Sequence, residues 1–277
     1  MCERDSNDDI LRGNELTRRR FGALGLGAGL AAMLPRVADA VEVTESEVEI
    51  KTPDGTCDAH FVHPANPTAA VLVWPDIFGL RPAFRSMGKR LAEAGYAVLT
   101  VNPFYRSLKG QPADREAAFS VARTLNPTTH VTDARAFVAW LDSQRAVDTR
   151  RKIGTTGYCM GGPIVMRTAA AVPERIGAAC SFHGGGLTTN DENSPHLLIP
   201  KMKASFLIAI ADNDDEKEPE SKNILRKAFD EAKLPAEIEV YKGANHGWVP
   251  PDSQAYHREQ AERAWERKLA LFARALA

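Results

Sequence analysis

The chain has 277 residues, of which 44% are hydrophobic and 26% are charged, and its formal net charge is −1. This composition is typical of a globular protein long enough for one large domain or two small ones. The near-neutral charge and the absence of a basic stripe argue against nucleic acid as a partner, so we expect a small-molecule substrate.

The first 40 residues resemble an export signal. Consecutive arginines at positions 18–20 precede an apolar, glycine-rich run at 22–34, and a small-x-small cleavage pattern ends at Ala40. This is similar to a twin-arginine signal, a route that carries folded proteins. The run is shorter than the roughly 18 residues that span a bilayer, so we expect no stable membrane anchor. We predict a cleaved signal over 1–40, a single domain over 41–277 and a periplasmic or secreted protein.

Export would leave three cysteines: Cys57, Cys159 and Cys180. An odd number implies at least one free thiol in an oxidising compartment. Cys57 and Cys180 lie in strand-like apolar runs, which favours two separate buried thiols, with a disulfide between them as the alternative. No spacing of cysteine or histidine indicates a metal site, and we expect no cofactor.

After the signal, strand and helix patterns alternate along the chain. Polar and apolar residues alternate over 42–52 and 57–63 around Asp54-Gly55, which predicts an antiparallel hairpin. Continuous apolar runs indicate strands of a parallel sheet covered on both faces. The expected strands are 69–74, 97–101, 152–156, 177–182, 204–211 and 237–241, and the expected helices are 83–94, 115–124, 129–143, 163–171, 219–232 and 253–276. We predict an α/β fold, a doubly wound, mainly parallel sheet opened by a hairpin.

A strand, a sharp turn and a helix are predicted around Gly157-Tyr158-Cys159-Met160-Gly161. Glycines two positions before and after the cysteine let the strand and the helix pass closely. The thiol would lie at the positive end of the helix, which favours thiolate. This pattern is typical of a nucleophile elbow, although a cysteine in a glycine-rich turn can also be a small core residue.

Two further polar segments follow predicted strands, and each is predicted to be a loop. The acidic run Asp212-Asn213-Asp214-Asp215 follows the strand 204–211, and His246 follows the strand 237–241. The order of nucleophile, acid and histidine matches the α/β-hydrolase triad. The longer acidic stretch from Asp212 to Glu220 could instead be only a solvated loop. It does not fit a calcium loop, because Lys217 stands where that pattern requires glycine.

These motifs, together with Trp74-Pro75-Asp76-Ile77-Phe78-Gly79-Leu80 and Gly243-Ala244-Asn245-His246-Gly247, resemble the dienelactone hydrolase family from about residue 48 to the C-terminus. The resemblance implies an α/β-hydrolase fold with Cys159 as nucleophile and His246 as base. It favours Asp214 as the acid, with Asp212 and Asp215 left open. Backbone N–H groups of Ile77 and Met160 would form the oxyanion hole. The segment 183–186 is interpreted as a turn at a strand end.

Two departures from the family pattern concern activation and substrate. The family carries glutamate before Ile-Phe-Gly, where it acts on the resting thiol; here the residue is Asp76, which could activate the thiol or only cap the turn. Arg106 matches one of two family arginines that hold a substrate carboxylate, but Pro250 stands at the second position. The apolar walls of the site, or alternatively parts of the core, would be Phe78, Phe104, Tyr105 and Trp248.

The predicted function is hydrolysis of a small lactone or ester through a Cys159–His246–Asp214 triad and an acyl-enzyme. One alternative is a thiol carboxylesterase of broad specificity. Another, from a different class, is a hydrolase scaffold that serves as a non-catalytic binding protein with an inert thiol. The oligomeric state is not predicted.

Overall fold

The computed structural model describes residue 34 and residues 39–277. Most of the predicted export signal therefore lies outside the described residues. Among those that are described, no helix is long and apolar enough to cross a membrane.

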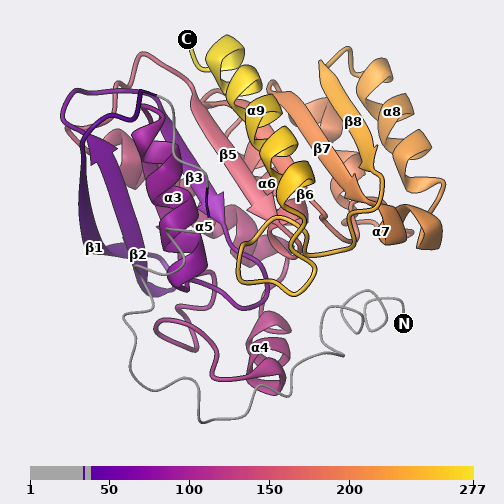
Figure 1. Cartoon of the computed structure of the whole chain (residues 1–277), viewed down its shortest axis with the longest axis horizontal. Helices are drawn as coiled ribbons and strands as arrows, with labels where there is room; N and C mark the ends of the chain where they lie inside the picture. The colour runs from indigo at the N-terminus through magenta and orange to yellow at the C-terminus, as the bar shows by residue number, and fades with distance from the viewer. Residues whose placement is uncertain (1–33, 35–38) are drawn as a thin grey trace.

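Eight strands of the described chain form one sheet in the order β1-β2-β4-β3-β5-β6-β7-β8 (Figure 1). The first two form the antiparallel hairpin, and β2 also runs antiparallel to β4. The remaining neighbours are parallel. This arrangement confirms the predicted doubly wound sheet opened by a hairpin. The strands are β1 Val43–Thr52, β2 Gly55–Pro64, β3 Ala70–Trp74, β4 Ala97–Val101, β5 Ile153–Tyr158, β6 Ile176–Phe182, β7 Ser205–Ala211 and β8 Ala236–Tyr241.

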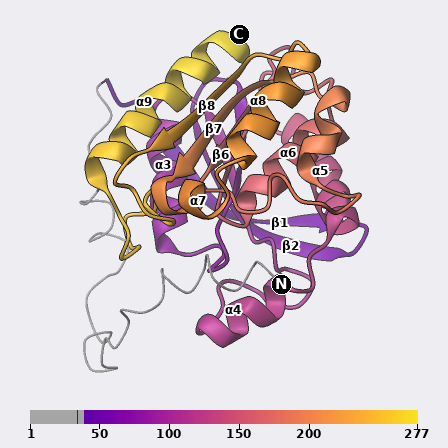
Figure 2. The same cartoon turned by 90° about the vertical axis from the view of Figure 1, so that its right-hand side faces the viewer.

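Helices cover both faces of this sheet, as Figure 2 shows edge-on: α3 and α9 lie on one side, and α5, α6 and α8 on the other. The short helix α4 lies beyond the edge at which the parallel strands end (Figure 1). The helices are α3 Pro82–Glu93, α4 Arg115–Ala122, α5 Pro127–Asp142, α6 Gly161–Ala171, η1 Pro195–Lys201, α7 Asp212–Lys217, α8 Ser221–Glu231 and α9 Arg258–Ala275.

The central strands are buried on both faces, which explains their continuous apolar sequence. In β3, Leu72 and Trp74 pack into the core under α5 and α6, whereas Val71 and Val73 pack under α3 and α9. Successive strand residues point to opposite faces of a sheet, so one short apolar run contributes to two cores.

Most predicted elements occur within a few residues of their predicted ends. Helix α5 begins two residues earlier than predicted because Asn126 accepts hydrogen bonds from the N–H groups of Thr128 and Thr129, which caps a helix with proline at its first position. Helix α9 begins five residues later, because the residues before His257 form turns.

Two short helices were not predicted. The segment η1 has no long apolar periodicity, and the acidic run interpreted as a loop forms the six-residue helix α7. Three aspartates in the first turn of α7 complement the positive end of the helix dipole. The expectation of a loop there was wrong, although the polar side chains remain at a strand end.

Candidate active site

The turn between β5 and α6 holds Cys159 in a left-handed backbone conformation, with φ of +52°. A side chain at Gly157 would overlap the carbonyl group of Gly161, and one at Gly161 would overlap the carbonyl oxygen of Trp74. Only glycine fits at these close approaches. The geometry of the predicted elbow is therefore present, and the Cys159 residue is 6% exposed.

The loop after β8 brings His246 to the same edge of the sheet. Its backbone N–H donates to Asn213 Oδ1 at 2.8 Å, and its ring Nδ1 lies 2.6 Å from Asp214 Oδ2. The residue is 2% exposed. A carboxylate at Nδ1 orients the imidazole and leaves Nε2 as the proton-carrying atom on the other side.

The three aspartates of α7 have different partners. Asp212 accepts hydrogen bonds from Lys242 Nζ at 2.7 Å and from the Gly243 N–H at 2.9 Å. Asp215 pairs with Lys222 Nζ at 2.5 Å. Only Asp214 of the three lies against the imidazole of His246. The alternatives left open by the sequence are thus separated by their contacts.

The imidazole of His246 has a perturbed pKa. Burial alone would lower this pKa, but the charge of the neighbouring Cys159 and the hydrogen-bonded Asp214 carboxylate outweigh burial and raise the pKa to about 10. The site therefore favours a charged imidazolium beside the sulfur. Such an arrangement suits a thiol that reacts as thiolate.

The loop after β3 lies against the start of α6, because Gly161 packs directly on the carbonyl groups of Trp74 and Pro75. The loop that contains Ile77 therefore begins in direct contact with the start of the helix that follows Cys159. Among the described residues, neither the Ile77 N–H nor the Met160 N–H has a hydrogen-bond acceptor. Two such donors are what an oxyanion hole requires.

Asp76 forms a buried ion pair. Its two carboxylate oxygens accept from Arg81 at 2.6 and 3.0 Å, and Oδ1 also accepts the Phe78 N–H at 2.9 Å. The same guanidinium binds Asp252. Asp76 therefore caps its turn and also ties the loop after β3 to the loop before α9. Its action on the thiol stays a prediction.

Arg106 is held between two carboxylates. Its guanidinium donates to Asp133 at 2.7 and 2.9 Å and to Asp54 at 2.5 and 3.0 Å. The Tyr105 hydroxyl also donates to Asp133 at 2.7 Å. A substrate carboxylate would have to compete with these partners for the guanidinium.

A model of the dienelactone hydrolase family matches residues 57–276. The chain belongs to this family. The matched region begins in β2 and contains every predicted site residue.

Relatives agree with this assignment. The carboxymethylenebutenolidase of Rhodococcus opacus is 27% identical over 232 residues, which cover 82% of this chain and 90% of the relative. An Escherichia coli K12 protein assigned as a carboxymethylenebutenolidase is 30% identical over 212 residues, 74% of this chain and 77% of the relative. A crystal structure from Klebsiella pneumoniae, assigned as a dienelactone hydrolase, has a TM-score of 0.75 at 25% identity and covers 84% of this chain and 99% of that one. The protein is a hydrolase with the α/β-hydrolase fold.

The predicted aromatic walls differ in burial. In this family member Trp248 is fully buried, stacks on Tyr241 with ring centroids 4.6 Å apart and lies edge-on to Phe182. Phe104 is also buried, whereas Phe78 is half-buried. Trp248 and Phe104 therefore fit the alternative of core residues, and Phe78 retains exposed surface.

Cys57 and Cys180 are separate, buried free thiols, and no disulfide joins them. Burial raises the pKa of Cys180 to about 12 and raises that of Cys57 as well. Burial and a raised pKa make both of them poor nucleophiles. No group of three potential metal ligands occurs among the residues that the structure describes.

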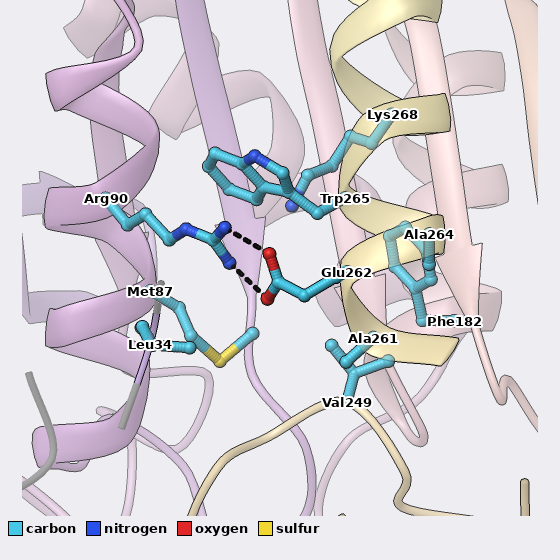
Figure 3. A pocket seen from close by; sticks show the side chains of 10 residues that line it. All are labelled: Leu34, Met87, Arg90, Phe182, Val249, Ala261, Glu262, Ala264, Trp265 and Lys268. Atoms are coloured by element: carbon cyan, nitrogen blue, oxygen red, sulfur yellow. Dashed lines mark hydrogen bonds and ion pairs between the residues drawn. The ribbon is translucent and has the colours of Figure 1, made fainter. Parts of the chain in front are cut away.

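A small pocket lies between α3 and α9 (Figure 3). Arg90 and Glu262 pair across it, and the Arg90 guanidinium and the Lys268 ammonium lie over the Trp265 ring at 4.1 and 4.6 Å. None of the predicted catalytic residues lines it. Its lining residues are Leu34, Met87, Arg90, Phe182, Val249, Ala261, Glu262, Ala264, Trp265 and Lys268.

Three residues near the site were not predicted to contribute to it. Arg81 and Asp133 pair with predicted site residues, and His183 accepts the Cys159 N–H. An acidic residue on the buried face of α5 could have indicated a partner for Arg106. The histidine directly after β6 had been interpreted only as part of a turn.

We expect Asp214→Asn to reduce the pH dependence of stability. The folded-state pKa of His246 is raised from 6.5 to about 10, so this group stabilises the fold below about pH 6.5, and that contribution is lost as the pH rises towards 10. Without the carboxylate the rise in pKa is smaller, and the fall in the free energy of unfolding between these pH values should be shallower. Urea unfolding at several pH values measures how the free energy of unfolding changes with pH.

Asp212→Asn is the matched control for this experiment. Hydrogen bonds from the Gly243 N–H and Lys242 lower the pKa of Asp212, so its contribution is lost only in acid, as the pH falls below 3.8. The control should keep the wild-type slope between pH 6.5 and 10. Equal slopes in wild type and Asp214→Asn would contradict the role of Asp214 in holding the imidazolium.

Proposed function

We propose that this hydrolase cleaves a small lactone or ester through Cys159, His246 and Asp214. The observation that carries the proposal is one buried imidazole that has Asp214 at Nδ1 and lies close enough to Cys159 for the charge of Cys159 to raise its pKa. The nucleophile needs an adjacent base, and the base needs an orienting carboxylate. Family membership supports the same reaction class.

The reaction would proceed in two halves. The Cys159 thiolate attacks the carbonyl carbon, and the N–H groups of Ile77 and Met160 stabilise the oxyanion. The C–O bond then breaks, His246 gives its proton to the leaving oxygen, and a thioester remains. Water next loses a proton to His246 and attacks the thioester carbon. The C–S bond breaks, the carboxylic acid leaves, and the thiolate–imidazolium pair is restored.

A sulfur nucleophile restricts the substrate class. Thiolate leaves more readily than an amide nitrogen or a simple alkoxide, so tetrahedral intermediates on those substrates return to reactants. Activated esters and enol-lactones have better leaving groups and fit this chemistry. The name of the Rhodococcus relative describes action on a butenolide, a lactone, that bears a carboxymethylene group.

Arg106 is the proposed contact for a substrate carboxylate. It is 16% exposed on its side chain and is shared with Asp54, which lies at the turn of the β1–β2 hairpin. Pro250 stands where the family has a second arginine, so an anionic substrate would be held by fewer cations. The occupied guanidinium favours, as a second candidate function, a thiol carboxylesterase that also accepts uncharged esters.

Substitution of the nucleophile and the base tests the proposed mechanism. We expect Cys159→Ala to abolish release of chromophore from a p-nitrophenyl ester, and His246→Ala to lower kcat by about a hundredfold or more. The control Cys57→Ala removes a buried thiol elsewhere and should retain kcat. Activity retained in Cys159→Ala would reject this mechanism, and no turnover of any ester or lactone by wild type would favour a non-catalytic binding protein.

Arg106→Lys tests the charge of the substrate. Lysine keeps a cation beside the buried Asp133 but loses bidentate geometry. For two esters that differ only by a carboxylate, we expect KM of the anionic one to rise about tenfold, with KM of the neutral one unchanged. Asp54→Asn should instead lower KM of the anionic ester, because it frees part of the guanidinium. Identical responses of both esters would remove Arg106 from the substrate site.

We also propose that Asp76 assists the thiol in addition to binding Arg81. Asp76→Asn should slow alkylation of Cys159 by iodoacetamide about tenfold or more. Asp252→Asn removes the other carboxylate from the same guanidinium and is the matched control. An equal decrease in both variants would show that Asp76 acts only by holding Arg81 in place.

A further inference from the structure

Behind the elbow lies a second histidine, His183, that the proposed reaction does not use. It is the first residue after β6, is 1% exposed and has φ of +40°. This backbone region is uncommon for residues other than glycine, although asparagine, aspartate and histidine enter it more often than most. Its N–H is bonded to the Ala209 carbonyl of β7 at 2.8 Å, so the strained residue is firmly held.

The ring of His183 contacts the nucleophile's own backbone. Its Nδ1 accepts the Cys159 N–H at 3.1 Å, and the Phe182 carbonyl shares this N–H at 3.0 Å. An acceptor at Nδ1 requires the neutral tautomer with hydrogen on Nε2. Burial and the charge of His246 lower the pKa of His183 well below its usual value, in agreement with a neutral ring.

The same ring contacts the proposed base. The imidazoles of His183 and His246 meet edge to face, with centroids 5.1 Å apart and planes at 61°. Trp248 packs against His183 from another side at 6.1 Å. One neutral side chain therefore touches both the backbone of Cys159 and the ring of His246.

The surrounding backbone leaves little freedom for this contact. A side chain at Gly162, in the first turn of α6, would lie 2.5 Å from Ser181 Oγ and 2.6 Å from Gly184 Cα. The turn after His183 therefore packs directly on the helix that begins after the nucleophile. Movement of His183 would have to displace either the elbow or this turn.

We propose that His183 is a positioning residue that fixes the Cys159 backbone through Nδ1 and supports the ring of His246. This inference rests on the proposed function, because positioning matters only if these two residues react. His183 does not exchange a proton in this role. Its contribution is the orientation of sulfur relative to imidazole, where a displacement of about 1 Å can cost up to a hundredfold in rate.

Three substitutions distinguish the contribution of the hydrogen-bond acceptor at Nδ1 from that of the ring of His183. His183→Asn keeps an acceptor, because Oδ1 lies as many bonds from Cβ as Nδ1 does, and asparagine tolerates positive φ. His183→Leu matches asparagine in size without an acceptor, and His183→Phe keeps a ring without one. His60→Leu is the control, since His60 is a histidine of β2 that is 4% exposed and lies outside the proposed site.

The measurements are kcat and KM for an activated ester, the pH profile of iodoacetamide alkylation at Cys159 located by mass spectrometry, and the thermal midpoint. We expect the Leu and Phe variants to lose about tenfold or more in kcat with KM changed less than about threefold, and to shift the alkylation profile to higher pH. The Asn variant should retain kcat within about threefold. The control should retain both kcat and the profile.

Two results would overturn the inference. One is wild-type kcat and alkylation in His183→Leu, or in His183→Phe should the leucine variant fail to fold. The other is a loss of kcat that is as large in the Asn variant as in the Leu variant and that follows the decrease in thermal midpoint. Such a result would indicate a structural role. Absence of turnover by wild type would reject the proposed function instead, and the alkylation profiles would still decide whether His183 positions the thiol.

Discussion

The close passage of β5 and α6 at Cys159 is the constraint on which the site depends. The left-handed turn is possible because Gly157 and Gly161 carry no side chains where backbone groups meet. The same contact packs the start of α6 directly on the loop after β3, which contains Ile77. A single steric requirement thus fixes the turn that carries the sulfur and its packing against the loop after β3.

Two sets of ion pairs join segments that are far apart in the chain. The buried guanidinium of Arg81 joins Asp76 to Asp252, which is far along the chain, and Arg106 joins the hairpin turn at Asp54 to Asp133 of α5. Removing one partner from such a buried pair strongly destabilises the fold, because the other charge remains buried and unpaired. Both networks therefore rigidify the segments that they join. They also occupy the charged groups that Asp76 would use in catalysis and Arg106 in substrate binding.

The family assignment and the elements could be predicted because they depend on local patterns. Apolar runs predicted the buried strands, and the glycines around Cys159 predicted the elbow. The start of α5 was predicted two residues too late, because capping by Asn126 extends the helix beyond its apolar periodicity. Helix α7 was missed because six polar residues resemble a loop until their aspartates are seen to complement the helix dipole. The export signal stays a prediction.

The sequence by itself determined which chemical groups reach the carboxyl edge of the sheet. A cysteine, an acidic run and a histidine follow three parallel strands, β5, β7 and β8, and the carboxyl ends of parallel strands meet at one edge. Only the tertiary structure decided which of them touch. It placed Asp214 instead of Asp212 or Asp215 on His246, turned Trp248 into the core and set His183 against the Cys159 amide. The physical reason is that these contacts depend on loop conformation within a few ångströms, which no local pattern of residue types encodes.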